Sequence, residues 1–184
     1  MIEGKLVNLR AREMSDVERM TRWINDRDVT RFMRGAYPWS SEAEEAFVRN
    51  QTSVPMAFGD LGFAIETKDG THIGGCGLHR ASPENRCAEL GIMIGEKAYW
   101  SKGYGSDTVA TLVRFAFEEM NLNRVELHVY DFNERGQAAY RKCGFVEEGR
   151  MRDAHYAEGA YSDVVVMALL HDEWVSTDFT AYDP

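Results

Sequence analysis

The chain has 184 residues, of which 44% are hydrophobic and 28% charged, and its formal net charge is −9. This composition is typical of a soluble globular protein and excludes a wholly disordered chain, a collagen-like repeat and a coiled-coil rod. The acidic balance also makes a general binder of the nucleic-acid backbone a poor candidate. We therefore expect one domain over residues 1–184, with a core of about 6–174 and a short tail of 175–184.

The cysteine pattern and the length of the apolar runs indicate in which cellular compartment the protein lies. Cys76, Cys87 and Cys143 form no C-x-x-C pair, which argues against a disulfide framework or a thiolate metal site. The first 30 residues lack an apolar signal region, and the longest apolar run, Val164–Leu170, is too short to cross a bilayer. We expect a cytoplasmic protein with no membrane anchor and no bound metal.

Two capping boxes, in which a serine precedes a glutamate by three residues, predict helix starts in the first 50 residues. They are Ser15 with Glu18 and Ser41 with Glu44. Apolar residues at helical spacing follow the first box. The expected elements are a strand at Leu6–Arg10, a helix over 17–24, an irregular aromatic stretch over 26–40 and a helix over 41–50.

In the middle of the chain, Asp69-Gly70 is a hairpin turn signal between two strand-like segments. A third strand precedes a loop with two glycines, and a long apolar helix follows that loop. The expected elements here are strands at Gly62–Thr67, His72–His79 and Ala88–Ile94 and a helix over Tyr104–Met120.

The last third begins with Arg124–Tyr130, which alternates between apolar and polar residues as a half-buried strand does. Asn133 can cap a helix that Gly144 ends. Strands at Phe145–Met151 and Tyr161–Leu170 close the chain. The whole order predicts one mixed α/β fold and not a regular βαβ alternation.

The loop Trp100-Ser101-Lys102-Gly103-Tyr104-Gly105-Ser106 joins a buried strand to a helix. Glycines let its backbone approach a ligand, and the helix start supplies N–H groups and the positive end of a dipole, which together suit phosphates. The loop matches neither the Walker nor the Rossmann pattern, so a nucleotide-binding protein of either kind is disfavoured. On local grounds it could also be an ordinary helix start.

The second motif runs from Asn133 to Phe145. With the glycine loop before it, it resembles the GNAT superfamily of acetyl-CoA-dependent N-acetyltransferases, which carries Q/R-x-x-G-x-G/A and then N-x-x-A/S-x-x-x-Y-x-x-x-G-F. Two positions depart from these patterns, Trp100 and Gly136. The residues that match are Gly103, Gly105, Asn133, Tyr140, Gly144 and Phe145.

The resemblance implies a single GNAT-type domain of the α/β (α+β) class. We expect a mixed, mostly antiparallel sheet of about six to seven strands, a splay between the fourth and fifth strands, 88–94 and 124–130, and helices on both faces. The order and the closing hairpin look most like the Rim-type branch, which holds ribosomal-protein N-terminal and spermidine acetyltransferases. The implied activity is direct transfer of acetyl from acetyl-CoA to a primary amine.

Such a transfer needs a base, because an alkylammonium with a pKa near ~10.4 carries no free lone pair at pH 7. Glu89 is the candidate: the resemblance places a strand glutamate fourteen residues before Gly103, and desolvation among Leu90, Ile92 and Ile94 would strengthen it as a base. An exposed or arginine-paired glutamate is the alternative. Tyr140 is the candidate acid for the leaving thiolate, with a packing aromatic as the alternative.

The resemblance also implies which residues hold the cofactor. The backbone of the fourth strand would meet the pantetheine arm as an added strand does, and the Met93 N–H would polarise the thioester carbonyl. Cys143 is expected to be buried and not a nucleophile. The expected contacts with acetyl-CoA are Ile92, Met93, Ile94, Ser101, Lys102, Gly103, Tyr104, Gly105, Ser106 and Asn133.

The acceptor stays open between a small cationic amine, such as a polyamine, and a protein N-terminus. Residues 145–184 hold nine acids and two arginines, so the last hairpin is either an acidic wall of the acceptor cleft or a solubilising surface. Residues 25–60 should form the other wall. A non-catalytic acyl-CoA-binding or sensory module is the alternative function, and a homodimer is a further expectation.

Overall fold

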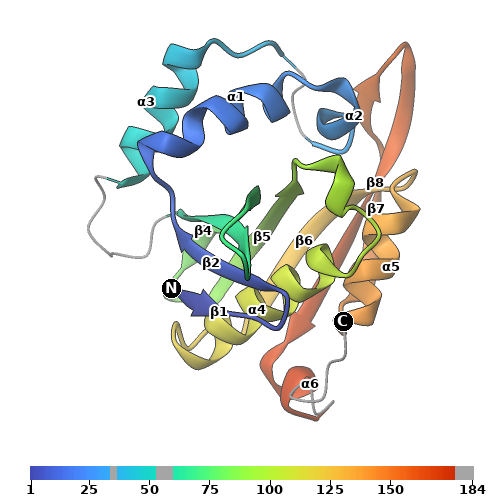
Figure 1. Ribbon diagram of the computed structural model, residues 1–184. Coiled ribbons are helices and arrows are strands. Elements are labelled where there is room, and N and C mark those ends of the chain that lie inside the picture. Colours follow the sequence, from blue (N-terminus) through green and yellow to red (C-terminus); the bar gives the residue numbers. More distant parts are fainter. Residues whose placement is uncertain (34–36, 53–59, 177–184) are drawn as a thin grey trace.

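The computed structural model describes residues 1–33, 37–52 and 60–176 (Figure 1). Their strands form one eight-stranded sheet in the order β1-β2-β3-β4-β5-β6-β8-β7. Every neighbouring pair is antiparallel except β5 with β6. The mixed, mostly antiparallel sheet is confirmed, with one strand more than predicted because the short β1 adds to its edge.

The strands and helices have the following bounds. The strands are β1 Ile2–Glu3, β2 Val7–Ala11, β3 Leu61–Thr67, β4 His72–Ser82, β5 Cys87–Ile94, β6 Arg124–Tyr130, β7 Val146–Ala157 and β8 Ala160–Leu170. The helices are α1 Val17–Ile24, α2 Arg27–Thr30, α3 Ser41–Thr52, α4 Tyr104–Glu118, α5 Glu134–Lys142 and α6 His171–Ser176, with short 3-10 turns η1 Met14–Asp16 and η2 Lys97–Tyr99.

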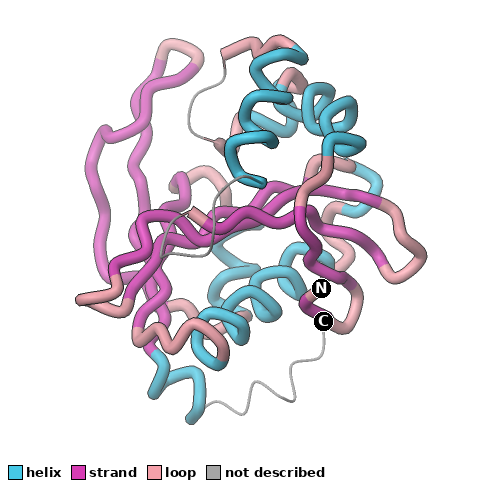
Figure 2. Tube along the Cα trace, turned by 90° about the vertical axis from the view of Figure 1, so that its left-hand side faces the viewer, coloured by secondary structure: helices cyan, strands magenta, loops and turns pink. Residues whose placement is uncertain are grey.

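Two separate cores pack the two faces of the sheet. The larger one joins α4 and the end of α5 to the strands through residues such as Leu112, Cys143 and Val165. The smaller one holds the apolar sides of α1, α2 and α3, with Met93 of β5 packed against it. Figure 2 shows the sheet edge-on between these two groups of helices, so the prediction of helices on both faces is confirmed.

The start of α4 is tied to the N-terminal strand by a buried carboxylate. Asp107 is 2% exposed, and its oxygens accept the backbone N–H groups of Lys5, Leu6 and Val7 at 3.1, 2.7 and 2.9 Å. A buried carboxylate needs such donors to be stable. These three bonds therefore fix where α4 begins relative to the sheet.

The parallel pair β5 and β6 separates after a short contact. Only Cys87, Ala88 and Glu89 pair with β6, opposite Arg124–Glu126, and the rest of β5 has no partner on β6. β4 stays paired with β5 as far as Ile94, and β8 stays paired with β6 as far as Tyr130. The predicted splay is thus confirmed, and it leaves backbone groups of β5 facing a gap.

Both predicted capping boxes are wrong, because the capping residues lie one or two positions before the predicted serines. Ser40 and not Ser41 caps α3, since its Oγ accepts the Ala43 N–H at 3.2 Å, and Glu44 is buried instead of reaching back to the cap. At the first helix, the Asp16 carboxylate accepts the Glu13 N–H at 2.9 Å, so the chain turns before Ser15. Neighbouring residues with equal capping ability compete at both places, and tertiary contacts decide between them.

Three short elements were not predicted: β1, α2 and α6. In the stretch expected to be irregular, Asp26 caps α2 by accepting the Asp28 N–H at 3.0 Å. Residues 34–36 of that stretch lie outside the described part, as do residues 177–184 of the expected tail, so the core bounds stay a prediction. Among the described helices, not one has the length and apolar character to cross a membrane.

Candidate active site

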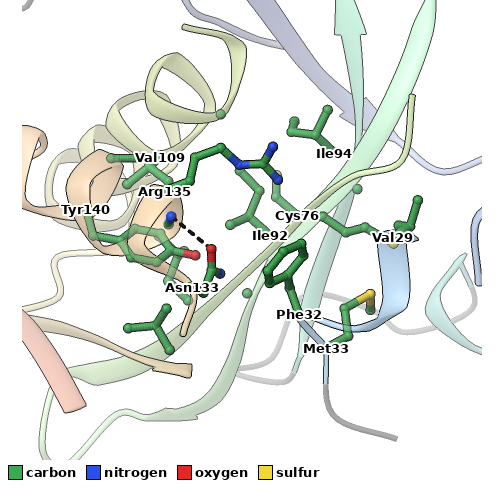
Figure 3. A pocket seen from close by; sticks show the side chains of 18 of the residues that line it. Val29, Phe32, Met33, Cys76, Ile92, Ile94, Val109, Asn133, Arg135 and Tyr140 are labelled. Carbon is green, nitrogen blue, oxygen red and sulfur yellow. Dashed lines mark hydrogen bonds between the residues drawn. The ribbon is translucent and has the colours of Figure 1, made fainter. Parts of the chain in front are cut away.

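A cavity of about 940 Å³ opens between the splayed strands, the starts of α4 and α5, and helices α1–α3 (Figure 3). Of the site residues predicted from the sequence, all except Tyr104 line it. The Tyr104 ring instead packs edge-on against Tyr99, with centroids 5.0 Å apart. The sequence motifs, which are far apart along the chain, therefore meet around one space.

The glycine loop turns sharply into α4 at the edge of this cavity. Gly103 has φ = +86° and is the residue before the helix, a conformation that glycine adopts without strain. The first-turn N–H groups of a helix lack acceptors within it, and the dipole there favours an anion. Trp100, at the position where the GNAT pattern has Gln or Arg, donates its Nε1–H to the Ile94 carbonyl at 2.7 Å and so ties the loop to β5.

The direction of the β5 backbone groups follows from its pairing with β4. The Gly95 N–H donates to the Ile73 carbonyl at 2.9 Å, and Met93 pairs with Gly75 in the same register. Since successive residues of a strand point their backbone groups to opposite edges, those of Met93 face β4 and those of Ile92 and Ile94 face the splay. The Ile92 N–H is therefore better placed than that of Met93 to polarise a thioester carbonyl.

Asn133 caps α5 as predicted: its Oδ1 accepts the Gly136 N–H at 3.0 Å (Figure 3). Gly136 stands where the GNAT pattern has Ala or Ser, and the contact with Asn133 explains why. A Cβ on Gly136 would lie 2.6 Å from the Asn133 Nδ2, closer than real atoms approach. Glycine here makes room for the cap, which offsets the weaker helix propensity of the residue.

Tyr140 faces the cavity from α5, beside Asn133 (Figure 3). Its ring also contacts Phe145, with centroids 6.1 Å apart. Burial raises the pKa of Tyr140 to about 12. The phenol therefore keeps its proton at neutral pH, as a proton donor must.

Glu89 also faces the cavity, but its surroundings differ from the predicted ones. Strand alternation puts Leu90, Ile92 and Ile94 on the side of the larger core and Glu89 on the opposite side with Met93. The carboxylate is 16% exposed; Arg80 Nη1 lies 3.0 Å from its Oε2, and His128 Nδ1 lies 3.5 Å from its Oε1. It lies beside a histidine and is paired with an arginine, which was the alternative from the sequence, and it is not surrounded by aliphatic side chains.

Comparison with known proteins decides the family. The model of the acetyltransferase (GNAT) domain matches residues 7–146, which is most of the chain. The chain belongs to the GNAT acetyltransferase family. It is therefore an acetyltransferase by family, and the predicted single GNAT domain is confirmed.

The chain is similar to proteins named ribosomal and spermidine N-acetyltransferases. It is 39% identical over 106 residues, 58% of this chain and 57% of the relative, to the Bacillus subtilis protein named "Putative ribosomal N-acetyltransferase YdaF". It is 26% identical over 92% of its length and 96% of the relative to the spermidine N(1)-acetyltransferase of Vibrio cholerae. The crystal structure of a Vibrio cholerae spermidine N-acetyltransferase in complex with CoA and spermine superposes with a TM-score of 0.84 at 25% identity, covering 92% of this chain and 98% of that one.

Within this GNAT cavity, several polar residues escaped the sequence reasoning: Arg12, Glu44, His79, His128 and Arg135. The Arg135 guanidinium lies 4.3 Å from the centroid of the Trp100 ring and 5.6 Å from that of Phe32, so it connects α5 with the glycine loop and with the segment that follows α2. The sequence does indicate His128, because in the alternating strand Arg124–Tyr130 it lies on the same polar face as Glu126. The others depend on strand register or on contacts between distant segments.

Cys143 lies outside the cavity lining and behaves as a packing residue. It is 2% exposed, its Sγ is 3.4 Å from the Ser106 carbonyl oxygen, and burial raises its pKa to about 12. A buried, protonated thiol is a poor nucleophile, as expected. No group of three or more His, Cys, Asp or Glu side chains among residues 1–33, 37–52 and 60–176 could hold a metal ion.

The two predicted walls of the acceptor cleft fare differently. In the predicted wall of residues 25–60, apolar side chains such as Phe32, Trp39 and Phe47 line the cavity, while residues 34–36 and 53–59 lie outside the described part. None of the described residues of β7 and β8 lines it. The acids of the hairpin are instead held by arginines at the surface, as in the contacts of Glu147 with Arg150 and of Glu148 with Arg124.

Proposed function

We propose that this protein transfers an acetyl group from acetyl-CoA directly to a primary amine. The observation that carries the proposal is that the glycine loop, the splay and Tyr140 all open on one cavity. We call the part around Ile92–Ile94, the 100–106 loop, Asn133 and Tyr140 the cofactor half. The acceptor half is the part around Arg12, α1–α3, His79, Glu89 and His128.

The cofactor half suits a long thioester with phosphates at one end. The start of α4 and Lys102 favour the phosphates. The backbone groups of Ile92 and the Ile94 N–H face a gap that an extended arm can enter, while the Ile94 carbonyl already accepts from Trp100. The relative that was crystallised with CoA has the same fold over nearly its whole length. These features support acetyl-CoA as the co-substrate.

The transfer itself needs three groups. Glu89, directly or through water, takes the proton that the ammonium must lose, and the amine nitrogen then forms its bond to the thioester carbon. The Ile92 N–H stabilises the charge that develops on the carbonyl oxygen. As the carbon–sulfur bond breaks, Tyr140 gives its proton to the departing thiolate. The nitrogen loses its second proton, which restores the Tyr140 phenol through water, so the products are an amide, free CoA and one proton held by Glu89.

The alternative is a non-catalytic acyl-CoA-binding module on the same fold. Binding alone does not require a protonated phenol beside the place of the thioester, and Tyr140 supplies one. The names of the relatives support both a ribosomal N-terminus and a polyamine as the acceptor class. A cytoplasmic location and a homodimer stay predictions from the sequence.

The test is the release of CoA thiol from acetyl-CoA with a panel of spermidine, an aminoglycoside and peptides with free N-termini. Tyr140→Phe should lower kcat about 100-fold or more while CoA affinity stays within about two-fold, because the lost proton acts only in the transition state. Tyr161→Phe is the control, since Tyr161 is exposed on β8 and lies outside the cavity lining. Equal turnover by Tyr140→Phe would remove Tyr140 from the mechanism, and bound acetyl-CoA without release across the panel would favour the binding module.

A further inference from the structure

The floor of the acceptor half is formed by β4 and β5 and carries few side chains. Their register places Gly77 opposite Gly91 and His79 opposite Glu89. The His79 ring covers the glycine pair, since a Cβ on Gly91 would lie 3.2 Å from its Nε2. The result is a trough floored by glycines and by the His79 ring, with Glu89 at one end.

Arg12 lies at the other end of this trough. A Cβ on Gly75 would be 3.3 Å from the Arg12 Nη2, which donates to the Cys76 carbonyl at 3.4 Å. The guanidinium carbon is 5.2 Å from the centroid of the Phe47 ring, and Arg12 lines the cavity. Burial lowers the pKa of Arg12, yet a guanidinium stays charged at neutral pH.

Glu44 is the acidic neighbour of this arginine. It lines the cavity at 4% exposure, and burial raises its pKa, against the opposing effect of Arg12. The Arg12 cation therefore lies near a carboxyl group whose pKa is raised. This end of the trough is not an acidic pocket for a second ammonium group.

The spacing along the floor sets a length. Gly75, under Arg12, and His79, opposite Glu89, are four residues apart on β4, which is roughly 13 Å at ~3.3 Å per residue. An extended peptide covers that distance in about three to four residues. A guanidinium has only donors, so what it can bind at that distance is an oxygen acceptor.

Resting on the proposed transfer, we propose that Arg12 determines acceptor specificity by binding a carbonyl or carboxylate oxygen of a peptide acceptor, no more than about four residues from the reacting amine, which lies between Glu89 and the Ile92 N–H. A polyamine presents only cations at that distance, and Arg12 opposes them by like charge. The acceptor class is then a peptide or protein N-terminus. A free amino acid has the same amine but is too short to reach Arg12.

The experiment compares kcat/KM for four acceptors: serine amide, the peptide amides Ser-Ala-Ala-Ala and Ser-Ala-Ala-Asp, and spermidine. The wild-type protein should favour the tetrapeptides. Arg12→Gln should lower kcat/KM for the tetrapeptides by about 10- to 100-fold, mainly through KM, and leave serine amide unchanged and spermidine equal or improved. Arg49→Gln removes the same charge from the exposed part of α3, outside the cavity, and is the control.

Two further variants separate acceptor binding from a structural role. If Arg12 only neutralises Glu44, the double variant Arg12→Gln/Glu44→Gln should recover the tetrapeptide kcat/KM; if Arg12 binds the acceptor, the loss should persist. Recovery would overturn the inference, as would equal losses for all four acceptors in Arg12→Gln or a wild-type preference for spermidine.

A binding measurement tests whether Arg12 binds the peptide independently of catalysis. Calorimetry of Ser-Ala-Ala-Asp amide with the CoA-loaded protein should show binding that Arg12→Gln weakens about 10-fold or more. Absence of CoA release with every acceptor would contradict the proposed transfer, while calorimetry would still decide on Arg12. Equal peptide affinity in the wild type and in Arg12→Gln would overturn the role of Arg12 alone.

Discussion

The two halves of the cavity differ in how the chain builds them. The cofactor half comes from one stretch, from Ile92 to Tyr140, and it presents backbone groups: the start of α4, the open edge of β5 and the capped start of α5. The acceptor half is assembled from segments between Arg12 and His128, and it presents side chains. A site made of backbone tolerates changes of side chain, and a site made of side chains changes its ligand when they change.

This difference separates binding from chemistry in the expected effects of mutation. In the cofactor half, backbone conformation should govern the affinity for CoA. In the acceptor half, single side chains should govern rate and specificity. Substitution of Glu89 should therefore impair turnover, and substitution of Gly103 should impair CoA binding.

The largest effect is expected from Glu89→Gln, which keeps the shape of the side chain and removes its charge. Loss of the base should lower kcat by about 100-fold or more and leave CoA affinity unchanged. Glu126→Gln is the matched control, because Glu126 pairs with Glu89 in register on β6 but lies outside the cavity lining.

The measurement is steady-state turnover with one fixed amine, together with the dissociation constant of CoA. Arg80 is 69% exposed, so it can turn to water when its partner loses charge, and folding should be preserved. A kcat for Glu89→Gln close to that of the wild type would show that water or another group takes the proton. The contacts of Glu89 with Arg80 and His128 would then be structural only.

A smaller effect is expected from Gly103→Ala in the cofactor half. An alanine at φ = +86° costs about 1–2 kcal/mol, so the loop should relax and CoA affinity should fall about 5- to 30-fold. At saturating CoA, kcat should stay within about two-fold. Isothermal titration with CoA gives the first number, and turnover gives the second.

Gly159→Ala is its matched control. Gly159 has φ = +83° in the turn between β7 and β8, and no atom lies within 4 Å of the place of its Cβ. It should suffer the same backbone strain and keep its CoA affinity. If both variants weaken CoA equally, general loss of stability and not the loop accounts for the effect.

What the sequence could predict follows the same division. The glycine loop and the Asn133 cap are local patterns, so the sequence alone predicts them, and the structure brings both to one cavity. The face of Glu89 also follows from the sequence, since Leu90, Ile92 and Ile94 alternate with it along the strand. The apolar neighbours taken without that alternation wrongly predict a carboxylate desolvated among them.

The acceptor half could not be found in this way. Arg12 matters because β2 brings it over Gly75, and that contact depends on the β4–β5 register and not on any local motif. The helix caps show a smaller error of the same kind. Ser40 and Ser41 can cap a helix equally well, and only the packed structure shows that Ser40 does so. Local sequence specifies turns and caps, whereas the identity of the acceptor depends on contacts over long separations.

The smallest effect is expected from the acids of the last hairpin, which composition alone made candidates for the acceptor wall. Glu147 lies 2.8 Å from Arg150 and 3.4 Å from Arg141, and these arginines lower its pKa, so it stays charged and paired at neutral pH. Its contribution to stability is present above the ordinary carboxyl pKa and is lost only as the pH falls through the lowered value.

Glu147→Gln should therefore change kcat/KM for spermidine and for peptides by less than about two-fold, because exposed ion pairs contribute little and are screened by salt. The measurement is an acceptor titration at low and at physiological ionic strength. A larger loss for spermidine at low salt alone would mean that the hairpin steers cations toward the cavity from a distance. A loss at both salt concentrations would show that Glu147 contacts the acceptor. The hairpin would then form part of the acceptor site, together with the segment that contains α1–α3.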